Sequence, residues 1–403
     1  MSRDGAASSR VIFLDGLRGI AAFVVIVSHL IAGFFPALYF GAQGRPGAEL
    51  MGAIATSPLF VAYSGTFAVY IFFVLSGFVI AASAARTACR LPVLVAARYL
   101  RLAVPVGASV FFAFALVNIF PGAPQRAAAV VGNWWLDLIY RPFNLTFGFA
   151  LREAFVKVYW TGVSYYNNVL WTMRIELAGS VAIYLFYRLI PKGVRVPALV
   201  LAGLLACFAT RAWPSDLLGF FFGALIYEAR ARGKLFRAPL LGAGLVVVGM
   251  YLGGLPFAPG DGTFYQALFA FVDRLSPAFG TVRVLGAAAL ILGIFLWEGS
   301  RLLLDSPPAQ FLGRISFALY LVHLPLLCVG FSELYLRFGQ FGAAPMGLAI
   351  ACYLAAAIGA AYLFTILVDE PTVGMLSRWK KARSARRAAA PSPSPADRRP
   401  GGN

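Results

Sequence analysis

One stretch of the chain decides the fold: Phe13-Leu-Asp-Gly-Leu-Arg-Gly-Ile-Ala-Ala-Phe-Val-Val-Ile-Val-Ser-His29. It is apolar enough to enter a membrane, yet it carries Asp15, Arg18 and His29. On a helix, Arg18 and His29 lie three turns plus about 20° apart, so they share one face and are separated by roughly 16 Å along the axis. Asp15 lies one turn before Arg18, close enough to pair with it. A charge inside a bilayer costs at least about 2.5 kcal/mol, so we expect this face to line a protein interior or a polar cavity.

The composition is typical of a polytopic membrane protein. Of 403 residues, 60% are hydrophobic and 12% are charged, whereas about 25% of the residues in soluble proteins are charged. Several apolar stretches reach the roughly 20 residues that a spanning helix needs. We therefore expect an all-α fold with about ten transmembrane helices. The expected spans are 11–35, 62–85, 102–121, 168–190, 196–212, 215–230, 238–256, 281–298, 310–332 and 345–368.

The distribution of charge predicts the orientation. Lys and Arg gather in alternate loops and after the last span, which places both termini in the cytoplasm by the positive-inside rule. Residues 1–372 are expected to form one membrane-embedded domain with a long outer loop over 122–167, and residues 373–403 a basic, Pro-rich, disordered tail. The net charge of +18 then reflects this rule and attraction to membrane lipids, so no nucleic-acid partner is expected.

Residue usage bears on the source and excludes some kinds of site. A preference for Arg over Lys, with abundant Ala and Gly, points to a bacterial genome and hence to a bacterial inner membrane protein. The four cysteines stand singly, and no Cys/His cluster has the spacing of a metal site. We therefore expect no bound metal.

A carboxylate and an imidazole are expected in the outer half of the bilayer. Counted from the ends of their spans, His29 and Glu176 lie at similar depth, and a buried carboxylate near an imidazole can orient it as a general base. Thr172 lies one turn before Glu176 on the same face, and Trp171 precedes it. The alternative is that Glu176 pairs with Arg174 or an outer-loop arginine for structural reasons alone.

The inner end is expected to gather arginines. Arg18 lies near the level of Arg98 and Arg101, which share one face where the third span begins. Three converging guanidinium groups suit a polyphosphate, because Arg binds phosphate in bidentate fashion. The alternative for Arg98 and Arg101 is ordinary positive-inside charge. In the second span, Ser76-Gly77 either allows close packing of helices or leaves room for a thin ligand.

The ninth span carries a polar stripe. Ser316, Tyr320 and His323 follow one another at helical spacing on an otherwise apolar segment. Packing alone can explain Ser316 and Tyr320. His323, one of two histidines in the chain, is either a second proton-handling residue or a structural hydrogen-bond donor.

These motifs, in this order, resemble the acyltransferase-3 family of integral membrane acyltransferases. They extend over nearly the whole chain, and the spacing of Arg18 and His29 is among the most specific of them. The matching segments are Asp15-Gly-Leu-Arg-Gly-Ile-Ala-Ala followed by His29, Phe72-Phe-Val-Leu-Ser-Gly-Phe78, Arg98-Tyr-Leu-Arg101 with Pro105, Leu170-Trp-Thr-Met-Arg-Ile-Glu176, Gly219-Phe-Phe-Phe-Gly223, Gly313-Arg-Ile-Ser-Phe-Ala-Leu-Tyr-Leu-Val-His323 and Asp369-Glu-Pro371.

The resemblance implies an O-acyltransferase that uses acyl-CoA and has no fused extracytoplasmic hydrolase-like domain. Such an enzyme moves an acyl group, often acetyl, from cytoplasmic acyl-CoA to a hydroxyl of a cell-envelope polysaccharide, a lipid-linked sugar or a glycosylated metabolite. Acyl-CoA is then the donor substrate, and no cofactor is permanently bound. The acyl chain, the acceptor and the need for a partner protein or a homo-oligomer stay open.

The expected mechanism follows the depth of the residues. The CoA phosphates bind the three arginines of the inner end, and the pantetheine arm passes Ser76 and Tyr320 toward His29. His29, oriented by Glu176, removes the proton of the acceptor hydroxyl as the thioester carbonyl is attacked. An acyl-His29 intermediate is the main variant.

Two other classes of function compete with this interpretation. Intramembrane Arg, His and Glu also fit a proton-coupled transporter or flippase for an envelope precursor. The sequence shows neither inverted repeats nor paired broken helices, which counts against a carrier. A scaffold for envelope assembly is the third hypothesis, and it assigns no chemistry to His29.

Overall fold

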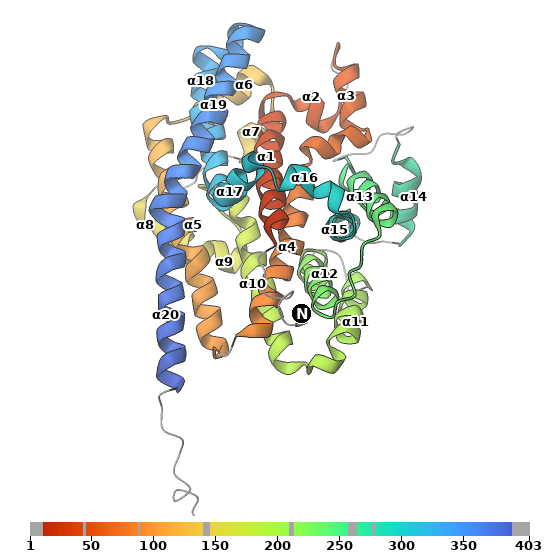
Figure 1. Ribbon diagram of the computed structural model, residues 1–403. Coiled ribbons are helices and arrows are strands. Elements are labelled where there is room, and N and C mark those ends of the chain that lie inside the picture. Colours follow the sequence, from red (N-terminus) through yellow and green to blue (C-terminus); the bar gives the residue numbers. More distant parts are fainter. Residues whose placement is uncertain are drawn as a thin grey trace, which may run out of the picture.

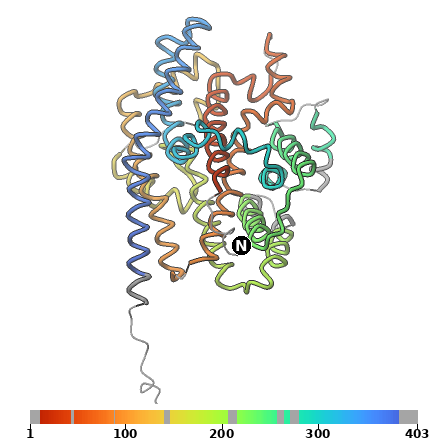
Figure 2. The backbone as a smooth tube through the Cα atoms, in the orientation of Figure 1, coloured from red at the N-terminus to blue at the C-terminus, as the bar shows by residue number. Residues whose placement is uncertain are grey.

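The computed structural model describes residues 11–42, 46–87, 89–139, 146–208, 213–256, 264–275 and 279–388, and it confirms the all-α class. Every regular element in these ranges is helical, and Figures 1 and 2 show the helices gathered into one bundle. Six helices among the described residues are long and apolar enough to cross a membrane. A seventh span results if Gly280–Leu296 and Glu298–Leu304, bent by 109°, are counted together. The chain is therefore a polytopic membrane protein.

Each of the ten expected spans contains a helix in its described part. The long helices are α1 (Ile12–Phe34), α4 (Gly65–Arg86), α5 (Leu91–Ile119), α10 (Trp171–Leu189), α11 (Arg195–Phe208), α12 (Trp213–Ala231), α13 (Pro239–Gly253), α15 (Phe279–Leu296), α17 (Pro307–Pro325), α19 (Ala343–Phe364) and α20 (Glu370–Ala388). Shorter helices connect them: α2 (Pro36–Phe40), α3 (Glu49–Ala55), α6 (Ala123–Val131), α7 (Trp134–Ile139), α8 (Phe147–Arg152), α9 (Val158–Thr161), α14 (Gln266–Leu275), α16 (Arg301–Leu304) and α18 (Ser332–Arg337).

Two helices extend beyond the expected boundaries. α5 begins at Leu91 rather than at 102, because Pro92 suits the first turn of a helix and the Val, Leu, Ala and Arg residues after it continue the turn. α19 passes through a π-helical segment, Thr365–Asp369, into α20. The expected tail therefore begins within α20, whose Ala, Lys and Arg residues favour helix. Residues 389–403 lie outside the described part of the chain.

The α1–α17 contact forms the centre of the bundle. A Cβ atom on Gly19 of α1 would lie 2.6 Å from the carbonyl carbon of Leu312 and 2.7 Å from the carbonyl oxygen of Ala309. A Cβ atom on Gly313 of α17 would likewise lie too close to the carbonyl oxygen of Asp15. The two backbones therefore touch, and the face of α1 that carries Arg18 is held against α17.

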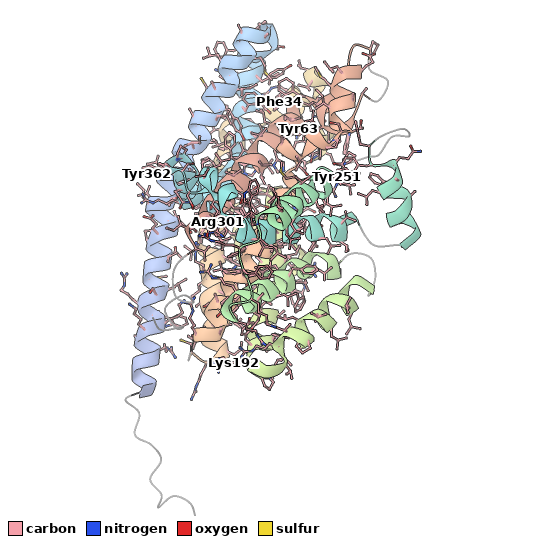
Figure 3. The ribbon with its side chains drawn as sticks, turned by 45° about the vertical axis from the view of Figure 1, so that its right-hand side comes forward. Phe34, Tyr63, Lys192, Tyr251, Arg301 and Tyr362 are labelled. Carbon is pink, nitrogen blue, oxygen red and sulfur yellow. The ribbon has the colours of Figure 1, made fainter. Side chains whose placement is uncertain are left out.

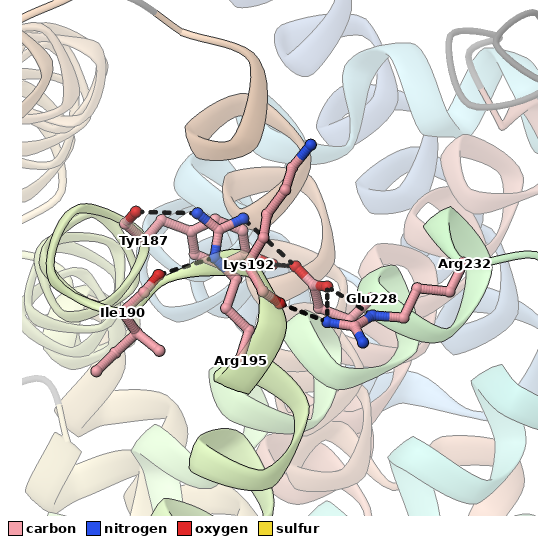
Figure 4. A network of polar contacts seen from close by, with 6 residues as sticks. All are labelled: Tyr187, Ile190, Lys192, Arg195, Glu228 and Arg232. Atoms are coloured by element: carbon pink, nitrogen blue, oxygen red, sulfur yellow. Dashed lines mark hydrogen bonds and ion pairs between the residues drawn. The ribbon is translucent and has the colours of Figure 1, made fainter.

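One end of the bundle, called here the basic end, combines the start of α1 with the ends of α4 and α12. It is fixed by Glu228, which is buried and accepts a hydrogen bond from Tyr187 Oη at 2.9 Å. The same carboxylate pairs with Arg232 at 3.3 Å and lies 3.9 Å from Arg195 (Figure 4). These contacts tie α10, α11 and α12 together. Figure 3 shows Lys192, in the α10–α11 connection, at the opposite end of the molecule from Phe34 and Tyr63.

Candidate active site

A cavity of about 170 Å³ lies between α1, α4, α5, α10 and α17, toward the basic end. Apolar side chains of α4 and α17, such as Phe72 and Phe317, form part of its wall. Its polar lining comes from side chains that converge from six segments far apart in the sequence: Arg18, Ser76, Arg98, Arg101, Thr172, Glu176, Arg314, Ser316, Tyr320 and Asp369.

Arg18 is held in place by α17 as well as by its own helix. Its Nε donates to Ser316 Oγ at 3.0 Å, and Nη2 donates to the carbonyl oxygen of Gly313 at 3.2 Å. The expected pair with Asp15 is confirmed, with Arg18 Nη2 at 3.3 Å from Asp15 Oδ1. Arg18 therefore faces the protein interior, as the cost of a charge facing lipid requires.

Arg98 and Glu176 form an ion pair across α5 and α10. Arg98 Nη2 lies 2.7 Å from Glu176 Oε2, and Nε donates to Ser180 Oγ at 2.9 Å. Ser76 of α4 donates to the other carboxylate oxygen, Oε1, at 2.5 Å. The carboxylate and the guanidinium are both largely buried, so each compensates the charge of the other.

Arg101 makes a second ion pair, with Asp369. The contact is bidentate, at 2.5 Å from Nη1 to Oδ1 and 3.2 Å from Nη2 to Oδ2, and the guanidinium also lies over the Phe317 ring. Arg98 and Arg101 therefore line the cavity as expected, but each has a carboxylate partner. Ordinary positive-inside charge does not need such partners.

Tyr320 lines the cavity and lies between Thr172 and His323. Its hydroxyl lies 3.0 Å from Thr172 Oγ1 and donates to the carbonyl oxygen of Val169 at 2.9 Å. The Phe72 ring packs edge-on against it, with centroids 6.0 Å apart. His323 lies beyond Tyr320, with ring centroids 5.9 Å apart. Neither histidine lines the cavity.

The two histidines contact each other, and their hydrogen bonds decide where the protons lie. His29 Nδ1 lies 2.9 Å from the carbonyl oxygen of Val25, and His323 Nδ1 lies 3.1 Å from that of Leu319. A carbonyl only accepts, so both Nδ1 atoms carry hydrogen and both Nε2 atoms of the neutral rings hold a lone pair. The single hydrogen on His29 Nδ1 is then shared between the carbonyl oxygen of Val25 and His323 Nε2, which lies 3.2 Å from Nδ1. His29 Nε2 is left able to accept a proton.

The expected pairing of Glu176 with His29 is wrong: among the described residues, Glu176 binds Ser76 and Arg98, and His29 binds Val25 and His323. The reason is the level at which α10 starts. Asn167, just before it, is buried and donates to Ser109 Oγ and to the carbonyl oxygen of Leu321, deep in the bundle.

The offset follows from helix geometry. Thr172, at the start of α10, is level with Tyr320. Glu176 lies one turn below Thr172, and His323 lies one turn above Tyr320. The carboxylate is therefore roughly 10 Å closer to the basic end than the imidazoles. The structural alternative, a pair of Glu176 with Arg174 or an outer-loop arginine, names the wrong partner too, because the arginine that binds Glu176 is Arg98 of α5.

Two further residues test the remaining expectations. Trp171 packs edge-on against Phe73 and does not line the cavity. Ser76 does line it, and its hydroxyl is engaged by Glu176. The sequence interpretation missed Asp369 as the partner of Arg101. The signal was present, because an Asp after an apolar stretch at membrane depth requires a cation.

Comparisons with known proteins identify the family. The acyltransferase-3 family model, described as an acyltransferase domain, matches residues 11–366. The chain is 27% identical over 366 residues to the O-acetyltransferase PaAT-1 of Phomopsis amygdali. The alignment covers 78% of this chain and 72% of PaAT-1. No solved structure matches the chain significantly. The matched residues run from the start of α1 beyond the end of α19, and the chain belongs to the acyltransferase-3 family.

Proposed function

We propose that the protein is a membrane O-acyltransferase that moves an acyl group from acyl-CoA to a hydroxyl. The observation that supports it most is the histidine pair: His29 Nδ1 contacts the carbonyl oxygen of Val25 and His323 Nε2, an arrangement that favours the tautomer with a lone pair on His29 Nε2. The name of the O-acetyltransferase relative favours acetyl as the group transferred. The proposed acceptor is a cell-envelope polysaccharide, a lipid-linked sugar or a glycosylated metabolite.

The chain's own residues suffice for the proton transfers. The acceptor oxygen attacks the thioester carbonyl carbon as His29 Nε2 takes the hydroxyl proton. The carbon–sulfur bond then breaks, and the imidazolium returns the proton to the CoA sulfur, giving an ester and free CoA. The hydrogen bonds at Nδ1 keep the ring oriented and stabilise its positive charge during the step.

The donor is proposed to enter from the basic end. Arg18, Arg98 and Arg101 line the cavity below Tyr320, and the pantetheine arm extends along it beside Ser76. Since Tyr320 separates the cavity from the histidines, its side chain must move aside for the thioester to reach His29. In the cell, we propose a bacterial inner membrane location with this end and both termini in the cytoplasm.

Release of CoA thiol from the protein in lipid vesicles tests the proposal. Wild-type protein given acetyl-CoA should release thiol only when a hydroxyl acceptor is present. His29→Ala should lower this rate at least about 100-fold and leave CoA binding unchanged. A transporter or flippase would move its cargo without releasing thiol, and full activity of His29→Ala would exclude His29 as the base.

A further inference from the structure

A second, larger cavity opens at the basic end, where the start of α1 meets the ends of α4 and α12. Its volume is about 690 Å³, within the range of small-molecule sites. Arg18 lines both this cavity and the smaller one, so the two cavities border the same side chain. The smaller cavity, at about 170 Å³, has room for a narrow chain and not for a nucleotide.

The larger cavity is strongly basic. Arg18, Arg86 and Arg230 line it against one carboxylate, Asp15, which pairs with Arg18. Among the described residues, neither Arg86 nor Arg230 has a carboxylate within 4.0 Å. The acid nearest in sequence to Arg230 is Glu228, which binds other arginines (Figure 4).

The donors of Arg86 are available to a ligand. Its Nε donates to the carbonyl oxygen of Ala82 at 2.9 Å, which fixes the side chain along α4 and leaves Nη1 and Nη2 for an anion. Arg101, by contrast, has both terminal nitrogens on Asp369, and Arg98 has Nη2 on Glu176 and Nε on Ser180. The cations without carboxylate partners are therefore in the larger cavity.

An aromatic ring completes the lining. Tyr227 of α12 faces the cavity and packs edge-on against Phe78 of α4, with centroids 5.8 Å apart. Aromatic side chains bind nucleobases by stacking. Phosphate-binding arginines beside an aromatic ring are the chemistry of a phosphorylated nucleotide.

We propose that the larger cavity holds the nucleotide end of CoA, with Arg86 and Arg230 on its 3′-phosphate. Arg18, between the two cavities, then binds the diphosphate, and the pantetheine arm continues into the smaller cavity. This inference rests on the proposed function, which supplies the donor. The phosphate ligands are then Arg86 and Arg230 in place of the expected Arg98 and Arg101. Arg86 and Arg230 both lie outside the family motifs quoted above.

A structural role is the competing explanation. Arg86 and Arg230 lie in the last turns of α4 and α12, where a cation interacts favourably with the helix dipole. A role of that kind affects thermal stability and does not distinguish one CoA derivative from another. The two explanations therefore differ in what they predict for ligand binding.

Binding of CoA and of 3′-dephospho-CoA to the purified full chain in lipid nanodiscs tests the proposal. Wild-type protein should bind CoA at least about tenfold more tightly than 3′-dephospho-CoA. Arg86→Ala and Arg230→Ala should lower CoA affinity to that of 3′-dephospho-CoA, with affinity for the latter nearly unchanged. The matched control is Arg90→Ala, an exposed arginine at the same end that does not line the cavity; CoA affinity should stay at the wild-type value.

The failures are distinguishable. If Arg86→Ala and Arg230→Ala bind CoA as wild type does, or lose only thermal stability, the nucleotide site is wrong and the O-acyltransferase proposal stands. If wild-type protein binds neither CoA nor 3′-dephospho-CoA, acyl-CoA is not the donor, and both proposals fail. Arg86→Glu serves as a second variant at an exposed position, and it should weaken CoA binding more than Arg86→Ala does.

Discussion

At His29, the two ring nitrogens have different surroundings. Nδ1 is held by the carbonyl oxygen of Val25, one turn earlier on α1, and by His323. Nε2 is the nitrogen that these contacts leave as an acceptor. His323 thus occupies the place that a carboxylate has in a Ser-His-Asp triad, but as a neutral acceptor.

Substitutions of His323 should show whether it orients the His29 ring or only fills space in the core. His323→Leu removes the acceptor for His29 Nδ1–H, and we expect kcat to fall about tenfold or more, with the KM for acyl-CoA little changed. His323→Gln offers an amide oxygen at a similar position and should recover part of kcat. Steady-state kinetics and thermal melting of both variants check this.

Equal kcat in the two variants would contradict the positioning role of His323. So would losses of kcat that follow melting temperature alone, because His323 is fully buried and any substitution there disturbs packing.

At the scale of elements, ion pairs join α5 to its neighbours. Removing one partner from a largely buried pair leaves an uncompensated charge, at a cost of about 3–5 kcal/mol. Glu176→Gln should therefore destabilise the protein by leaving Arg98 unpaired. Arg98→Gln combined with Glu176→Gln should be less damaging than the sum of the single substitutions.

A double-mutant cycle in thermal or denaturant stability measures this coupling. Additive effects would contradict the coupling of Arg98 and Glu176, and a loss of kcat in Glu176→Gln with unchanged stability would contradict a purely structural role of Glu176.

The α1–α17 contact depends on glycine. Gly19→Ala places a methyl group against the backbone of Leu312 and Ala309, which cannot yield as a side chain does. We expect a loss of stability of about 1–3 kcal/mol together with lower activity, because Arg18 and His29 both face α17. Gly359→Ala is the matched control, since its Cβ meets nothing within 4 Å in α19. Its stability should be unchanged or slightly higher. Equal effects of the two substitutions would contradict the close contact.

Sequence reasoning predicted what one helix can carry by itself. Helical spacing placed Arg18, Asp15 and His29 on one face, and the structure has that face against α17. It did not predict contacts between helices whose relative level depends on distant residues. The partner of Arg101 is Asp369, separated from it by 268 positions.

The depth of Glu176 shows the same limit. Counting residues from the end of a span assumes that every span starts at the membrane surface. α10 starts inside the bundle, because Asn167 binds Ser109 and Leu321 there. Only tertiary contacts could have revealed that offset.

For the molecule as a whole, both cavities lie between the histidines and the basic end, and the proposed donor binds in them. The basic end admits acyl-CoA in our proposal, so the acceptor must approach from the other end of α1. Both substrates can then be bound together, and initial rates measured at several concentrations of each should give intersecting lines in a double-reciprocal plot. Parallel lines would instead support the acyl-His29 variant, since His29 Nε2 is equally placed to be a nucleophile.

The long helix formed by α19 and α20 bears on sidedness. Ala343–Arg383 is a continuous helical span of 41 residues, roughly 60 Å by helical rise, whereas the hydrocarbon core is about 30 Å thick. The helix is therefore about twice as long as that core, and its basic C-terminal part, α20, forms its lower end in Figure 1. An epitope fused after Ala388 would be cut by protease from one face of a sealed vesicle only. In our proposal the donor enters at the basic end, which is the lower end in Figure 1 as well, so the compartment on that face would supply acyl-CoA.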